Sequence, residues 1–257
     1  MSQDLPPLTA AFYGEPPARE AHLPVVERWA DCVHLAEDHP QREIEFLHRQ
    51  MNEEANVLEN AASSLVDFPD ADWEIRMWLA RQCADEARHV MSYAKLVQRR
   101  GGHVGQFPVM NFQYRIIRRI DSLIGRLAVQ NRTFEADGLD AAIHAEKVAR
   151  QKGDTELSGV YDAQGADEIM HVGFANAWIR KAVKADPRNV LRMAAALSQG
   201  TRAFLEVSAG GGGDVSAYGV AQTDRRLAGF EEGEIAVAHD QAEARRAVAR
   251  AKAGAGA

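Results

Sequence analysis

The chain has 257 residues, of which 46% are hydrophobic and 26% charged, as is typical of a soluble globular protein. A net charge of −7 argues against sequence-independent binding of nucleic acid, which requires a basic face, so a local patch of Arg115, Arg118 and Arg119 is interpreted as solvated surface. The sequence has no apolar run of about 18 residues that could span a membrane, and its first thirty residues do not resemble a secretory signal. Two cysteines, Cys32 and Cys83, do not indicate a disulfide framework. We therefore expect a cytoplasmic protein without a membrane partner.

The first forty residues are expected to extend the main fold. Residues 1–24 contain five of the nine prolines, which predicts an extended segment, and residues 25–37 predict a short amphipathic helix. A longer helical pattern begins near Gln41 and ends at 66–70, where Pro69 breaks it. The connection to the next pattern is short, so we expect two antiparallel neighbouring helices.

The second long helix is expected to end at Gly101, because glycine readily adopts the left-handed conformation that closes helices. A third helical pattern begins near Asn111 and extends toward Lys152, with a bend expected at Gly138. The turn at 153–154 ends it, and a fourth helix is predicted from about 155 to 184.

Pro187 opens a fifth predicted helix, and residues 210–213 are interpreted as a flexible link. Residues 224–230 and 243–253 are further helix candidates, followed by a tail that we expect to be disordered. The predicted organisation is therefore an N-terminal extension, a helical bundle and a C-terminal helical extension, at 1–40, 41–184 and 185–257 respectively.

One polar motif occurs twice, in the second and fourth long helices. Residues 84–90 and 166–172 share the pattern Ala-Asp-Glu-x-x-His-Val. Residues three apart lie on one face of a helix, so Glu86 stands beside His89, and Glu168 beside His171, as two ligands of one metal would. Both pairs interrupt an apolar stripe, which predicts that they are buried.

The first and third long helices each add a lone glutamate in the core register, Glu54 and Glu135. Glu54 precedes Glu86 by 32 residues and Glu135 precedes Glu168 by 33, so the chain is interpreted as a duplicated helix pair. Each pair supplies one Glu and one Glu-x-x-His, which together form the ligand set of ferritin-like di-iron and di-manganese bundles.

Electrostatics favour metal in such an interior. Four buried carboxylates would repel one another, whereas two divalent cations balance their charge and neutral imidazoles complete the ligand set. Oxygen and nitrogen ligands without thiolate suit iron or manganese, although zinc would be tolerated. The expected cofactor is two iron ions, with a manganese or mixed iron–manganese centre as the alternative.

The spacing Glu45-x-x-His48 fits the same pattern, but its members flank the apolar stripe, and the pair is interpreted as surface. Four residues lie one helical turn from a candidate ligand and could line a pocket, although packing also explains each of them. These four are Cys83, Tyr93, Asn131 and Gln164.

The span 41–184 resembles the ferritin-like di-metal carboxylate superfamily. Within it, Phe-Glu-Ala-Asp-Gly-Leu-Asp at 134–140 and the Gly-Asp turn at 153–154 resemble a largely uncharacterised bacterial family of ferritin-like proteins. The resemblance implies an all-α fold, a four-helix bundle with additional terminal helices, and a metal site, but no substrate. That family often has a His shortly before the first lone Glu, where this chain has Asn52.

The string Asp-Glu-Ala-Arg-His at 85–89 is similar to the ligand motif of bacterial di-iron monooxygenases. A metal-bound His normally donates its second ring N–H to an acceptor. The likeness implies that Asp85 would hold His171 and that Asp167 would hold His89. The alternative is that both are exposed acids beside buried ones.

Fold alone does not separate the reactions that this scaffold supports. The leading expectation is a dioxygen-dependent oxygenase or oxidase acting on a small organic substrate, with an external electron donor, in a monomer or small homo-oligomer. Segments outside the bundle could cover a pocket with Trp29, Phe204, Tyr218 and Phe230. The alternative is a ferritin-like iron-handling or ferroxidase protein, and a tRNA-modifying hydroxylase is a third possibility that the acidic charge disfavours.

Overall fold

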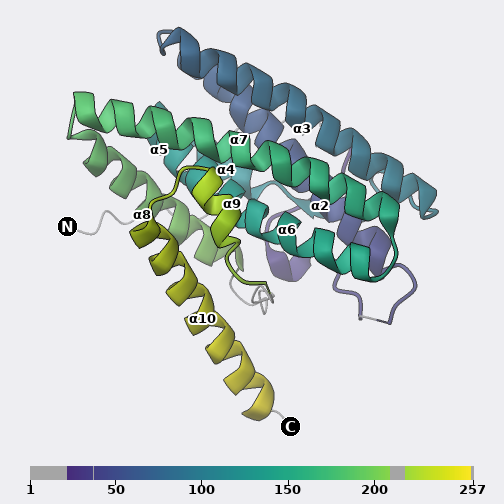
Figure 1. Cartoon of the computed structure of the whole chain (residues 1–257). Coiled ribbons are helices and arrows are strands. Elements are labelled where there is room, and N and C mark those ends of the chain that lie inside the picture. The colour runs from purple at the N-terminus through teal and green to yellow at the C-terminus, as the bar shows by residue number, and fades with distance from the viewer. Residues whose placement is uncertain (1–21, 37, 209–217, 256–257) are drawn as a thin grey trace. The chain divides into compact units, whose positions relative to one another are not determined.

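The computed structural model of the chain describes residues 22–36, 38–208 and 218–255. The expected N-terminal extended segment up to residue 21, the glycine link and the end of the tail lie outside the described residues. The described residues are mostly helical, which confirms the all-α class (Figure 1). They form two compact units, one from Met1–Gln130 with Asp186–Gly211 and one from Asn131–Ala185 with Gly212–Ala257. None of the described helices has the length and apolar character that a membrane span requires.

The first unit is built on a pair of long helices, α2 (Arg42–Asp67) and α3 (Trp73–Arg99), which lie side by side (Figure 1). Both match the predicted helices. Acidic Glu43 and Glu45 in the first turn of α2 complement the positive end of its dipole. After α3, Gly101 has a φ of +85°, and the N–H of Gly102 donates to the Val97 carbonyl at 2.9 Å. This bond pattern closes the helix as predicted.

The helix expected at 25–37 is wrong. Residues Val25–Val26 form the short strand β1, which pairs in parallel with β2 (Val109–Met110), and Trp29–Asp31 form a single 3-10 turn, η2. Two adjacent β-branched valines favour an extended backbone, and the N–H of Val109 donates to the Pro24 carbonyl at 2.9 Å. The pairing partner lies far along the chain, so local periodicity does not reveal it.

The third predicted helix is interrupted. It comprises α4 (Phe112–Arg118), α5 (Leu123–Val129), the π-helical segment η3 (Gln130–Glu135) and α6 (Ala136–Gln151). Between α4 and α5, the side chain of Ser122 accepts the Gly125 N–H and caps α5. The Arg126 Nε donates to the Ile120 carbonyl at 3.0 Å, which satisfies an oxygen that the break removes from the helical pattern.

The fifth predicted helix, α8 (Asn189–Ser208), packs against α4 and α5 within the first unit. A Cβ atom at Gly125 would lie 2.9 Å from that of Ala196, so glycine permits this close approach. In α4, Arg115 is only 7% exposed, so its interpretation as solvated surface is wrong. Arg118 is ion-paired with Asp67 at the end of α2.

The second unit contains α6 and the long helix α7 (Thr155–Ala185), which lie side by side, with α9 (Gln222–Leu227) and α10 (Glu232–Ala255). As predicted, the third helix ends at the Gly-Asp turn, where the Leu157 N–H donates to Asp154 Oδ1 at 3.0 Å. The two C-terminal helices begin earlier than predicted. The buried apolar core of this unit consists of Ala136, Leu139, Val172, Ala228, Phe230 and Ile235.

Candidate metal centre

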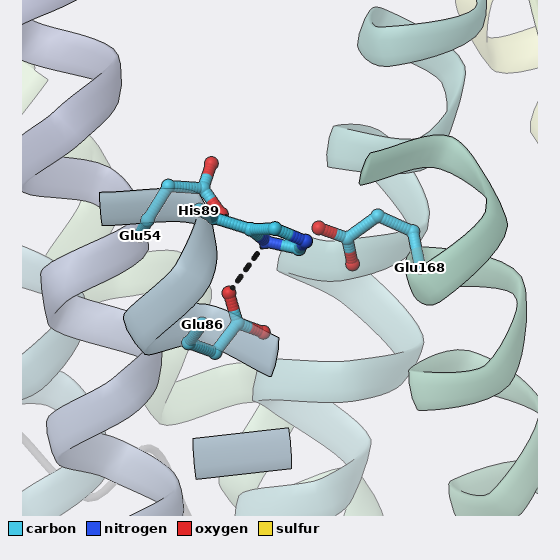
Figure 2. A group of neighbouring side chains, drawn as sticks. All are labelled: Glu54, Glu86, His89 and Glu168. Atoms are coloured by element: carbon cyan, nitrogen blue, oxygen red, sulfur yellow. Dashed lines mark hydrogen bonds and ion pairs between the residues drawn. The ribbon is translucent and has the colours of Figure 1, made fainter. Parts of the chain in front are cut away.

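Three of the predicted ligands meet in the first unit. Glu54 lies on α2, and Glu86 and His89 lie on neighbouring turns of α3 (Figure 2). His89 Nδ1 lies 3.0 Å from Glu54 Oε2 and 3.1 Å from Glu86 Oε2. The three residues are at most 5% exposed. We call them the first triad.

The other three predicted ligands meet in the second unit. Glu135 is the last residue of η3, and Glu168 and His171 lie on α7. His171 Nδ1 lies 3.3 Å from Glu135 Oε2 and 3.6 Å from Glu168 Oε2. All three are buried, at 2% to 4% exposure. This second triad repeats the composition of the first, with two carboxylates around one imidazole nitrogen.

The donor atoms of each triad suit a divalent cation. Within each triad, one ligand atom per residue can be chosen so that the atoms lie within 4.8 Å of one another, and each triad belongs to a buried group that could hold a metal ion. Neighbouring ligands of an octahedral ion are separated by roughly 3.0 Å when the bonds are about 2.1 Å long. The contacts of 3.0 and 3.1 Å in the first triad are hydrogen-bonded ion pairs whose length is also compatible with that separation, and those of the second triad, at 3.3 and 3.6 Å, are wider.

Charge points to the same conclusion. Each triad places two carboxylates and one imidazole in a buried environment, where unneutralised anions are costly. Among the described residues, Glu168 Oε2 is buried and accepts no hydrogen bond. A cation would neutralise the acids and occupy that oxygen. The residues therefore fit a metal with oxygen and nitrogen ligands.

Two of the four predicted pocket residues touch the second triad. Gln164 Nε2 donates to Glu168 Oε1 at 3.5 Å, one turn away on α7, and Asn131 Nδ2 donates to the main-chain carbonyl of His171 at 3.3 Å. In the first unit, Cys83 Sγ lies 3.9 Å from the Leu58 carbonyl, and the Tyr93 side chain is fully buried in α3. Gln164 and Asn131 thus hold parts of the candidate site.

Asp85 and Asp167 differ in their surroundings. Asp85 is only 5% exposed and accepts hydrogen bonds from Arg81 at 3.3 Å and from Arg88 at 3.1 Å, both on its own helix. Asp167 is half-buried on α7. The description of both as exposed acids is therefore wrong for Asp85. Their role as acceptors for the opposing imidazoles stays a prediction.

The third Glu-x-x-His spacing belongs to a different kind of cluster. Glu45 and His48 are 4% and 0% exposed, so their interpretation as surface residues is wrong. Glu45 is neutralised by Arg42 at 2.8 Å and by Arg49 at 3.1 Å. His48 Nε2 accepts the Gly105 N–H at 2.9 Å, and burial lowers the pKa of its ring. Arginine partners on adjacent turns distinguish this pair from the triads.

Sequence reasoning missed a row of buried amides on α2. Asn52 Nδ2 donates to the Met110 carbonyl at 2.7 Å, which gives this position a structural role in fixing β2. The Asn56 side chain accepts the Tyr114 N–H at 3.1 Å, and Asn60 Nδ2 donates to Gln130 Oε1 at 2.6 Å, at the first residue of η3. The spacing of four between these asparagines was the available signal.

The helices and their buried carboxylate–imidazole groups define an all-α protein with a candidate metal centre. The chain belongs to the family described as Protein of unknown function (DUF455), whose family model matches residues 3–236. No curated protein and no solved structure matched the chain. The family gives no activity, so a function has to be argued from the site.

Proposed function

We propose that the two triads supply the ligands of two iron ions and that the protein is a ferritin-like di-iron oxidoreductase. The observation that carries the proposal is the repetition of one geometry: in each triad, a single imidazole nitrogen contacts a lone Glu and the Glu of its own Glu-x-x-His. Four carboxylates and two imidazoles match the ligand set of ferritin-like di-iron and di-manganese bundles. Two divalent cations balance that set.

The reaction that we propose is a dioxygen-dependent oxygenation or oxidation of a small organic substrate. Bound iron would supply the redox chemistry, with electrons from an external donor. The protein's residues would hold the ions and keep bulk water away, and the low exposure of both triads supports this role. Gln164 would orient Glu168 through its side-chain amide, and Asn131 would fix the backbone of His171.

Metal analysis is the first test. Protein grown with ample iron should contain two iron or manganese ions per chain, and Glu168→Ala should lose most of this metal, because the ions would lose a charged ligand. Glu43→Ala, which alters an exposed acid paired with Arg100 at the surface, is the matched control and should retain the wild-type content. A reproducible content of one ion, or of zinc alone, contradicts the dinuclear iron assignment.

Oxygen consumption tests the reaction itself. The reduced protein should consume dioxygen in the presence of a reductant and an organic substrate from a metabolite panel, and sedimentation should give a monomer or small homo-oligomer. Oxidation of many irons per chain by a large hollow assembly, without any organic substrate, would instead establish the iron-handling alternative.

A further inference from the structure

A buried arginine in the second unit joins α9 to the start of α6. Arg225 is 6% exposed, and its Nη2 donates to Asp140 Oδ2 at 2.7 Å, to Asp137 Oδ1 at 3.2 Å and to the Ala136 carbonyl at 3.2 Å. Burial disfavours the charged guanidinium, but the Asp140 and Asp137 carboxylates hold the pKa of Arg225 above its ordinary value. Ala136 directly follows the candidate ligand Glu135.

A second contact reaches η3 itself. Arg132, three residues before Glu135, is ion-paired with Glu234 in the first turn of α10. The Arg132 guanidinium lies 5.2 Å from the centre of the Phe230 ring, and that of Arg225 lies 5.3 Å from the same ring. Phe230 is thus held by two cation–π contacts while its ring packs in the core of the unit.

The same segment also binds the helix that carries the other two ligands of the second triad. Asn176 Nδ2 on α7 donates to the Ala228 carbonyl at 2.8 Å, and Ala228 shares the buried core with Val172, the neighbour of His171. Residues 220–235, which we call the C-terminal clamp, therefore contact η3, α6 and α7. These contacts lie on both sides of Glu135 in the sequence.

The conformation of η3 explains why Glu135 needs such support. A π-helical turn accommodates one extra residue. If η3 returned to α geometry, the side chains after this residue would shift in register by one position, which is a rotation of about 100° around the helix axis. Glu135 would then no longer face the His171 ring, whose Nδ1 lies 3.3 Å from its carboxylate. Because π geometry is less stable than α geometry on its own, contacts from outside the helix must hold it.

We propose that the C-terminal clamp is a positioning element for the second triad, with Arg132 and Arg225 as its positioning residues. The inference rests on the proposed function, since it concerns metal binding by that triad. Arg132 holds η3 through Glu234, and Arg225 holds the start of α6 through Asp137 and Asp140. The clamp thereby fixes the helical register at which Glu135 reaches His171 and Glu168.

The test compares Arg132→Ala and Arg225→Lys with Arg226→Ala. The control residue, Arg226, lies on the same segment and pairs with the exposed Glu232 at 2.5 Å. Calorimetric titration of the metal-free proteins with Mn(II), well below their unfolding temperatures, should give two ions for the wild type. In both clamp variants one of the two ions should bind about 10 to 100-fold more weakly than in the wild type, whereas Arg226→Ala should match the wild type.

Hydrogen exchange of the metal-free proteins provides a readout that does not depend on metal. Residues 130–140 should exchange about 10-fold faster in both clamp variants, whereas residues 84–92 should not change. Unchanged exchange in 130–140, or wild-type Mn(II) affinities in both variants, overturns the positioning role. If the wild-type protein binds no Mn(II), the proposed function is refuted. Faster exchange of residues 130–140 in the two clamp variants would, in that case, still support the role of the clamp in holding η3.

Discussion

Replacing Glu86 with Gln should have opposite effects on stability with and without metal. Ligand oxygens of Glu54 and Glu86 lie within 4.8 Å of each other in a buried site. With an effective dielectric constant of about 20, two unit negative charges at that distance repel by roughly 3.5 kcal/mol. The His89 ring nitrogen lies within hydrogen-bond distance of both carboxylates and offsets part of this repulsion, so we expect a net gain of about 1 to 2 kcal/mol in the metal-free variant.

That gain corresponds to a rise of about 4 °C in the unfolding temperature of a chain of this size. In the metal-loaded protein the substitution should lower stability, because the ion loses a charged ligand. The affinity for Mn(II) should fall by more than the roughly 10 to 100-fold that is typical when only an outer-shell partner is changed. The variant should therefore be more stable than the wild type after chelation and less stable with saturating Mn(II).

Glu45→Gln is the matched control, since it changes the same residue type at the same spacing from a histidine. Its carboxylate is bound by Arg42 and Arg49, so its loss should lower stability by about 1 kcal/mol with or without metal. Calorimetric scans of both variants and the wild type, after chelation and again with Mn(II), measure these differences. If Glu86→Gln lowers the stability of the metal-free protein as Glu45→Gln does, the argument from buried like charges is refuted.

Three further predictions concern groups outside the triads. Asp85→Asn and Asp167→Asn should each weaken Mn(II) binding about 10 to 100-fold in a folded protein. If both variants bind Mn(II) with wild-type affinity, Asp85 and Asp167 are not acceptors for the imidazoles. Burial lowers the pKa of His48 below 6.5, so the unfolded chain takes up this proton at a higher pH than the folded chain does, and stability should fall as the pH drops below about 6.5. In urea unfolding, His48→Gln should reduce this dependence of stability on pH. An unchanged pH dependence would contradict the lowered pKa. Burial raises the pKa of the Cys32 thiol from 9.0 to about 11. In a Cys83→Ser background, alkylation of Cys32 at pH 8 should therefore be about 100-fold slower than that of a free thiol. Alkylation at the rate of a free thiol would contradict the raised pKa.

The candidate ligands could be found from sequence because each one breaks a local rule. A charged residue in the apolar stripe of a helix is an anomaly, and its repetition at matching intervals makes coincidence a poor explanation. Glu45 flanks the apolar stripe of α2, and that position alone predicts a surface residue. Arg42 and Arg49, three and four residues away on the same helix, were the sign that its charge is compensated and can be buried.

Helix ends with a local cause could be predicted from the sequence, whereas those that depend on distant residues could not. Gly101 and Pro69 end helices through their own backbone preferences, and these ends were predicted correctly. The break before Ser122 was missed because Ile117, Ile120 and Ile124 continue the apolar spacing across it. The π-helical register of η3 and the pairing of β1 with β2 depend on residues far away in the chain, which no periodicity encodes.

The order in which the chain leaves the ribosome has a consequence for the first unit. Its last helix, α8, packs on α4 and α5, but the whole of residues 131–185 is synthesised in between. At about 5 to 20 residues per second, translation from Gln130 to Ser208 takes roughly 4 to 16 seconds. During that time the faces of α4 and α5 that receive Ala196 and Gly200 of α8 have no helix to cover them. Nascent chains stalled between these points should therefore bind a general chaperone such as a ribosome-associated holdase, and chains extended past α8 should release it.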